Sequence, residues 1–257
     1  MNQKLFEIFL RQDGVMTKST YVVQGANSAM ARALVELNPQ HRFVLFSENP
    51  LGYAPEAEHL AFQGPALDEE FMKTSIKAAA DQWQQIDGYA HFSGSILLKP
   101  LHLTRLDEWE EVMRRHVTTA VVGLRALLPI LKQQGFGSVV LVSSTAARIG
   151  LQNHEAIAAA KGALEGLIRS CAATYAPVRF NGVAPGLTRS RMSQRIVENE
   201  NALKTSLQLQ LQSIPQLAEA RDQAEMISFL LSERSQMISG QIIAVDGGLS
   251  TTKRLGL

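Results

Sequence analysis

The stretch from Ser138 to Arg169 constrains the fold more than any other part of the chain. It opens with Val139–Val142, a short apolar run rich in β-branched residues, as expected of a strand buried on both faces of a parallel sheet. Hydroxyl residues follow at 143–145, at the carboxyl end of the strand, where open α/β sheets place their ligand crevice. The next segment, 156–168, reads as an Ala- and Leu-rich helix whose single basic residue is Lys161.

Strand and helix patterns alternate along most of the chain. Apolar runs predict further strands at 21–23, 42–46 and 88–92, in the segment 178–184 and at 240–246, and helical patterns cover 68–85, 106–131 and 218–231. Such alternation predicts parallel strands joined by right-handed crossovers. The 257 residues, of which 46% are hydrophobic, suit one domain with a sizeable core. We therefore expect a single-domain α/β fold with a doubly wound parallel sheet.

Composition excludes several classes of function. The net charge is +1 and there is no long basic block, so nothing indicates binding to nucleic acid. No apolar stretch reaches the roughly 18 residues of a transmembrane helix, so we expect no membrane partner. The single cysteine, Cys171, excludes an intrachain disulfide and favours a reducing cytoplasm. We interpret it as a small buried apolar residue.

Residues 1–15 form an N-terminal extension without a convincing signal peptide, because their apolar residues are few and are interrupted by Glu7 and Arg11. Two interpretations stay open. Either the native chain starts near Met16, or the extension is a short amphipathic helix that packs on a partner. The main domain is then 16–257, with a small polar lid at about 189–216.

Ser144 and Lys161 carry a resemblance to the short-chain dehydrogenase/reductase family, and the likeness extends over about 20–250. That family places a serine at the end of this strand, a tyrosine thirteen residues later and a lysine four residues after the tyrosine. Position 157, where the resemblance implies the tyrosine, is Ile157. In the family the tyrosine gives and takes the proton, and the lysine lowers the pKa of the tyrosine and holds the nicotinamide ribose. Isoleucine has no ionisable group and cannot do this work.

The segment after the first strand is similar to the phosphate loop of the family, T-G-x-x-x-G-x-G. Gly25 matches the first glycine, whereas Ala29 and Ala31 stand at the other two. Alanine is often accepted at the third position, but the methyl group of Ala29 points toward the approaching dinucleotide. The helix N-terminus here still favours an anion. The resemblance implies that Gly25, Asn27, Ser28 and Met30 contact the cofactor.

Other family positions complete a Rossmann-type dinucleotide site. Glu48 follows the second strand, where an acidic side chain holds the adenosine ribose and repels the 2′-phosphate of NADP, which favours NAD over NADP. A solvated loop charge is the alternative interpretation. Further cofactor contacts are implied for Ser47, Gly94, Pro185, Gly186 and Thr188.

Two histidines are candidates to replace the missing phenol. His154 lies seven residues before Lys161, the spacing that the related enoyl-carrier-protein reductases use for their tyrosine. His116 stands where the family has an asparagine that kinks the helix and anchors a water of the proton relay; histidine both donates and accepts near neutral pH. Alternatively, each is a structural histidine without a role. Glu155 could act as the base if burial raised its pKa.

These features favour a divergent NAD(P)-dependent oxidoreductase acting on a small carbonyl/alcohol pair, with Ser144, Lys161, His154 and His116 as the catalytic residues and no metal. The alternative is a non-catalytic dinucleotide-binding or scaffold subunit; a lyase or isomerase using the same cleft comes third. By analogy with the family, we expect a homodimer or homotetramer that pairs through the helices at 106–131 and 156–170.

Overall fold

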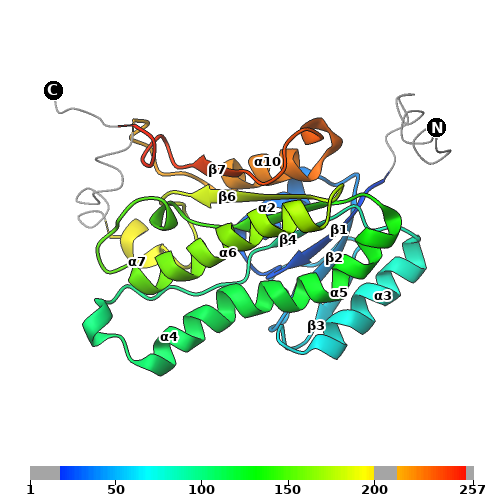
Figure 1. Ribbon diagram of the computed structural model, residues 1–257, viewed down its shortest axis with the longest axis horizontal. Helices are drawn as coiled ribbons and strands as arrows, with labels where there is room; N and C mark the ends of the chain where they lie inside the picture. Colours follow the sequence, from blue (N-terminus) through cyan, green and yellow to red (C-terminus); the bar gives the residue numbers. More distant parts are fainter. Residues whose placement is uncertain (1–17, 200–212, 253–257) are drawn as a thin grey trace.

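The computed structural model describes residues 18–199 and 213–252 (Figure 1). The predicted extension at 1–15 and the middle of the predicted lid lie outside these ranges. The centre of the molecule is a seven-stranded parallel sheet in the order β3-β2-β1-β4-β5-β6-β7. Its strands are β1 Thr20–Gln24, β2 Arg42–Ser47, β3 Leu60–Gln63, β4 Gly88–His91, β5 Ser138–Val142, β6 Arg179–Pro185 and β7 Ile242–Val245. The prediction of one doubly wound α/β domain is confirmed.

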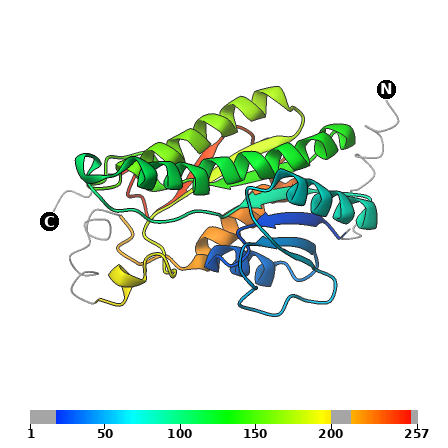
Figure 2. The same ribbon diagram turned by 90° about the horizontal axis from the view of Figure 1, so that it is seen from below.

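Helices cover both faces of the sheet (Figures 1 and 2). On one face lie α3 Glu69–Trp83, α4 Leu106–Met113, α5 Thr119–Gln134 and α6 Glu155–Thr174. On the other face lie α2 Ala29–Leu37 and α10 Ala220–Leu231, which pack against each other. The short helix α7 Gln194–Val197 and three 3₁₀ turns, Leu101–Leu103, Thr145–Ala147 and Glu233–Ser235, complete the described structure.

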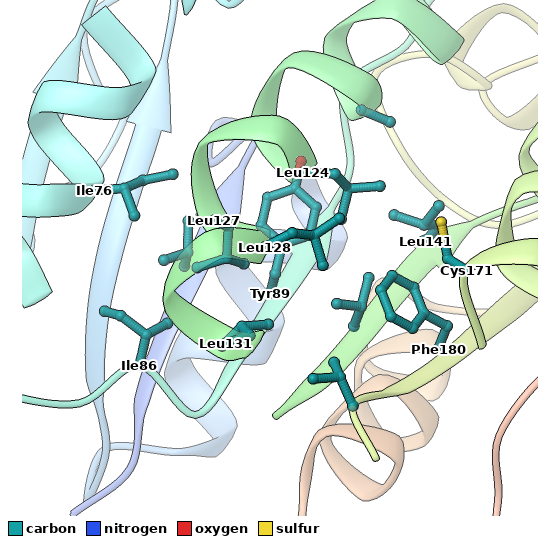
Figure 3. Packing of buried hydrophobic residues seen from close by; sticks show 14 of the residues in the cluster. Ile76, Ile86, Tyr89, Leu124, Leu127, Leu128, Leu131, Leu141, Cys171 and Phe180 are labelled. Atoms are coloured by element: carbon teal, nitrogen blue, oxygen red, sulfur yellow. The ribbon is translucent and has the colours of Figure 1, made fainter. Parts of the chain in front are cut away.

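Each face of the sheet has its own hydrophobic core. Under α3, α5 and α6, the ring of Tyr89 on β4 packs among leucines of α5, and Phe180 on β6 lies beside Cys171 of α6 (Figure 3). The interpretation of Cys171 as a buried, free thiol is confirmed. Val23 and Leu34 belong to the core under α2 and α10. Because β1, β4 and β5 are buried on both faces, they form a rigid base for the loops at their carboxyl ends.

The segment predicted as one helix over 106–131 is kinked. The chain runs from α4 through a π-helical turn, Arg114–Thr118, into α5. His116 is the buried residue of this turn. Single π-turns inside helices recur at functional sites because they displace one residue from the regular helical face.

The strand β3 was not predicted. It contains four residues, Leu60–Gln63, half-buried and exposed in alternation at the edge of the sheet. So short a run beside a turn has little periodicity, and it becomes a strand through its parallel pairing with β2. The helix predicted at 156–168 extends to Thr174.

Candidate functional site

A cleft of about 650 Å³ opens at the carboxyl ends of β1, β2 and β4. This is the edge of the sheet where the sequence predicted a ligand site. Seven of the predicted cofactor contacts line it: Gly25, Asn27, Ser28, Met30, Ser47, Glu48 and Gly94. The loops after three separate strands therefore bring these residues together, although they are far apart in the sequence.

Gly25 allows the phosphate loop to approach the loop after β4. Its φ of +82° lies in the left-handed region, and a Cβ there would come within 2.7 Å of the backbone nitrogen of Ser93. Only glycine fits both requirements. Ala31 is fully buried against the second core, as helix–strand packing requires, whereas Ala29 lines the cleft at the start of α2. The N-terminus of α2 thus faces the cleft and favours an anion there.

The amide of Asn27 holds the loop after β2 against the phosphate loop. Its Nδ2 donates to the carbonyl oxygens of Asn49 at 3.2 Å and Pro50 at 3.1 Å, and its Oδ1 accepts from the N–H of Gly52 at 3.0 Å. The Ser47 hydroxyl donates to the oxygen of Asn49 at 2.7 Å. Asn27 and Ser47 therefore shape the wall of the cleft, and their polar atoms are already bonded within the protein.

Charged side chains surround the adenosine end of the cleft. Glu48 lies 3.9 Å from the guanidinium of Arg115, which also pairs with Glu111. The guanidinium of Arg32 lies over the ring of Tyr53, 5.7 Å from its centre, and pairs with Glu36. Glu48 is thus placed at the cleft, as predicted, but with a cation beside it.

Ser144 lies at the carboxyl end of β5 in extended conformation. Its Oγ accepts a hydrogen bond from the N–H of Ala146 at 3.2 Å, and a hydroxyl that accepts in this way can still donate to a ligand oxygen. The neighbouring Ser143 donates to the buried carboxylate of Glu165 at 2.8 Å. The two serines therefore differ: Ser143 links the end of β5 to α6, and Ser144 caps the turn that follows, outside the residues that line the cleft.

Lys161 is buried, with 7% of its surface exposed, and its Nζ donates to the carbonyl oxygen of Val142 at 2.6 Å. Burial lowers the pKa of this amine from its usual 10.5 to about 7. Its side chain thus reaches the end of β5, two residues before Ser144. A ligand with acceptor oxygens at this point would stabilise the ammonium form.

Ile157 packs into a hydrocarbon cluster between α6 and α4. It is 8% exposed and lies with Val112, Ala156 and Ala160, against Trp109 and Val117. The tyrosines of the chain lie in other surroundings. Tyr89 donates to Gln24 and Tyr53 to the oxygen of Ala26, whereas Tyr21 packs on His41 and Tyr175 on Phe180. In the described residues, no tyrosine hydroxyl is bonded to the amine of Lys161.

The imidazole of His116 lies against Gly94, one of the residues that line the cleft. Its Nε2 is 2.9 Å from both the nitrogen and the oxygen of Ser95, while its Nδ1 is buried without a partner in the described chain. Burial, assisted by the charge of Lys161, lowers the pKa of His116 to about 3. The imidazole is therefore neutral at physiological pH and lies within electrostatic reach of Lys161.

His154 is placed differently. It precedes α6, and its Nδ1 lies 2.7 Å from the carbonyl oxygen of Gln152. This contact holds the imidazole in the loop before the helix. The histidines whose protonation responds to the charge of Lys161 are His116 and His91.

His91 is the residue that sequence reasoning missed. It ends β4, is fully buried, and its Nε2 lies 3.0 Å from the hydroxyl of Thr119 on α5. Burial, and then the charge of Lys161, hold the pKa of His91 well below its usual range. A polar residue at the carboxyl end of a central strand is the signal that could have identified it.

The remaining predicted contacts lie at the end of β6 and just after it, and they are engaged in packing. Thr188 donates to the oxygen of Gly186 at 3.0 Å and accepts from Gln223 at 3.2 Å, and Thr145 donates to the oxygen of Pro185 at 2.9 Å. Pro185, Gly186 and Thr188 do not line the cleft. The described residues contain no group of three or more His, Cys, Asp or Glu side chains that could hold a metal ion. Within the same ranges, no helix is long and apolar enough to span a membrane.

Comparison with known proteins finds one matching family model and several similar sequences. The family model described as enoyl-(acyl carrier protein) reductase matches residues 49–250. Levodione reductase of Leifsonia aquatica is 28% identical over 204 residues, covering 77% of this chain and 76% of the relative. A 2,5-dichloro-2,5-cyclohexadiene-1,4-diol dehydrogenase of Sphingobium indicum is 27% identical over 248 residues, covering 91% of this chain and 98% of the relative.

Two solved structures share the fold over nearly the whole chain. The crystal structure of levodione reductase has a TM-score of 0.83 at 26% identity and covers 91% of this chain and 98% of that one. The structure of ElxO with NADP bound also has a TM-score of 0.83, at 19% identity, and covers 92% of this chain and 100% of that one.

Proposed function

The chain belongs to the short-chain dehydrogenase/reductase family, and we propose that it is an NAD(P)-dependent oxidoreductase of a cyclic carbonyl/alcohol pair. The observation that carries this proposal is the cleft at the carboxyl ends of β1, β2 and β4, together with Ser144 and the amine of Lys161 at the carboxyl end of β5, the strand beside β4. The two curated relatives described above are named for oxidation or reduction, the second of them for a cyclic diol.

The residues of the cleft suit a dinucleotide. Gly25 and the N-terminus of α2 would receive the pyrophosphate, and Glu48 the adenosine ribose. The buried amine of Lys161, with one bond to Val142, has donors left for the hydroxyls of the second ribose. A nicotinamide dinucleotide bound here supplies hydride exchange with a carbon of the substrate.

At the substrate, Ser144 donates a hydrogen bond to the oxygen that gains or loses the proton. We propose that Ile157, which stands at the position of the family tyrosine, takes no part in proton transfer, and that the proton passes through an imidazole instead. His116 is the first candidate because it lies within electrostatic reach of Lys161 and its Nδ1 is unpartnered in the described chain. His154 is the second candidate, and would have to leave the oxygen of Gln152.

We propose NAD rather than NADP as the cofactor. The carboxylate of Glu48 at the end of β2 accepts hydrogen bonds from ribose hydroxyls and repels a 2′-phosphate. Arg115, 3.9 Å away, is shared with Glu111 and weakens this preference without reversing it.

The second candidate function is a non-catalytic dinucleotide-binding subunit. The packing of Ile157 in a hydrocarbon cluster, with every tyrosine engaged elsewhere, favours it, because losing the general acid typically lowers the rate by about 10²–10⁴-fold. In either case we propose a homodimer or homotetramer. Gly162 and Gly166 on α6 have open space where a Cβ would lie, which permits close approach of a second helix. The cytoplasm stays the predicted location.

Cofactor titration tests the proposal. We expect NAD to raise the melting temperature and NADP to raise it less, because only folded protein binds the dinucleotide. The variant Gly25→Val should abolish the shift, and Arg125→Gln, on the outer surface of α5, should preserve it. Absence of a shift with either dinucleotide would exclude the proposed oxidoreductase.

A further inference from the structure

A second hollow of about 640 Å³ adjoins the cofactor cleft. Arg191 and Met192 line both, so the second hollow opens from the end of the cleft where Ser93, Gly94 and Ser190 lie. Ile96, from the loop after β4, forms another part of its wall. The hollow therefore lies between the loops that follow β4 and β6, beside the cleft and outside the adenosine end.

The turn that carries Arg191 is fixed by its own hydrogen bonds. Ser193 is buried, and its hydroxyl donates to the oxygen of Thr188 at 2.6 Å while accepting from the N–H of Ser190 at 3.0 Å. Thr188 itself pairs with Ala218 in a β-bridge. The backbone on both sides of Arg191 is thus anchored to the end of β6, which limits the entropy lost when a ligand binds its guanidinium.

Arg191 differs from the other arginines near the cleft in its partners. Arg32 pairs with Glu36, Arg115 pairs with Glu111 and Glu48, and Arg189, two residues before Arg191, pairs with Glu219 at 2.9 Å. Among residues 18–199 and 213–252, no carboxylate pairs with Arg191. The carboxylate of Glu198 lines the same hollow but accepts from Gln194 at 2.8 Å. Within the described chain, the planar donors of Arg191 are therefore available to a ligand.

Beside the polar residues Gln194, Glu198 and Asn199, the wall contains two apolar side chains that are exposed to solvent. Ile96 is 49% exposed and Met192 is 42% exposed. Large apolar side chains beside an available guanidinium match a molecule with a hydrocarbon body and one anionic group. The apolar body gains from removal of water, and the anion gains from a forked, charge-assisted pair.

We propose that the substrate of this site carries a carboxylate, bound by Arg191, on an apolar body that contacts Ile96 and Met192. This proposal rests on the proposed function in one respect, that the adjoining cleft holds the dinucleotide. It assigns Arg191 to substrate specificity: the guanidinium orients the substrate, and the reacting oxygen lies near Ser144.

Binding of a matched pair of probes tests the proposal without requiring turnover. Cyclohexanecarboxylate and cyclohexanecarboxamide have the same shape and differ in charge. We expect calorimetric titration of the NAD-saturated protein to show the carboxylate binding at least about tenfold more tightly than the amide. The variant Arg191→Gln should erase this preference, Arg191→Lys should retain part of it, and Arg125→Gln, which removes a remote arginine paired with Glu69, should retain all of it.

Three results would overturn the proposal. The two probes could bind the wild-type protein equally, or Arg191→Gln could leave the preference intact. Alternatively, Arg191→Gln could weaken NAD binding more than about threefold with the preference unchanged, which would make Arg191 a ligand of the cofactor phosphates. A protein that prefers the carboxylate through Arg191 but oxidises no alcohol would instead contradict the proposed function and leave this proposal standing.

Discussion

The imidazole of His116 lies directly under Gly94, so close that a Cβ on Gly94 would come within 2.5 Å of its Cε1. Gly94, in the loop after β4, and His116, in the π-helical turn between α4 and α5, are thus in close contact, and no room is left between them for a larger side chain at position 94. Gly94 lines the proposed cofactor cleft and His116 lies within electrostatic reach of Lys161, so this contact joins that cleft to the proposed proton-transfer group.

Substitution of Gly94 should disturb both the loop that lines the cleft and the imidazole of His116. We expect Gly94→Ala to displace the imidazole or the loop and to destabilise the protein by about 1–3 kcal/mol, the usual cost of overpacking. Urea unfolding measures this loss. In the double variant Gly94→Ala/His116→Ala the added methyl group has room. The loss of stability in the double variant should therefore be smaller than the sum of the losses in the two single variants. Additive losses would show that the contact is not what excludes alanine at position 94.

The amide of Asn27 should be needed for the shape of the cleft. In Asn27→Ala three hydrogen bonds to residues 49–52 are lost together. We expect this variant to lose about 1–3 kcal/mol of stability and to bind NAD about tenfold more weakly. Calorimetric titration with NAD measures the affinity. Asn38→Ala removes a buried asparagine that bonds Leu34 and Ser228 away from the cleft, and should lower stability without a matching loss of affinity.

The buried histidine should make stability depend on acid pH. The pKa of His116 is about 3 in the folded protein and about 6.5 when unfolded, so the unfolded chain binds more protons between these values. Stability therefore falls as pH decreases from 6.5 toward 3, by up to about 1.4 kcal/mol per pH unit for this one group. Chemical unfolding of His116→Asn at several pH values should show a smaller slope than wild type. Equal slopes would mean that His116 is not buried in its neutral form.

A phenol at position 157 should increase turnover. We expect Ile157→Tyr to raise the rate of carbonyl reduction by about 10²-fold, the usual contribution of a general acid, while overpacking the cluster around Trp109 costs about 1–3 kcal/mol. Steady-state kinetics measures the gain. Ile157→Phe is the matched control, since it adds the same ring without the hydroxyl and should give no gain.

Much of the fold was predictable from local patterns. The run Val139–Val142 became the buried strand β5, and the Ala-rich segment after it became α6. These elements follow from apolar periodicity, which acts within a few residues. The strand β3 was missed because its four residues depend on pairing with β2.

The candidate site was predictable in position more than in detail. Strand ends located Gly25, Glu48 and Ser144 at one edge of the sheet, and the helix after β5 brings the amine of Lys161 to the end of that strand. The buried environment of His91, the clasp made by Asn27 and the lack of a partner for Arg191 in the described chain come from loops distant in sequence. No local pattern encodes such contacts, so sequence reasoning treated Asn27 as a hydrogen-bond donor to the cofactor and assigned no role to His91 or Arg191.

The central claim is that this cleft oxidises an alcohol with a bound dinucleotide although residue 157 is a hydrocarbon. The most direct test follows the absorbance of NADH while wild-type protein, saturated with NAD, is mixed with cyclohexanol or 4-hydroxycyclohexanecarboxylate. We predict NADH formation that falls at least about 10²-fold in Lys161→Met and in His116→Asn. A wild-type protein that binds NAD but forms no NADH with either alcohol, while Ile157→Tyr does form it, would contradict the account and identify the chain as a non-catalytic dinucleotide-binding subunit.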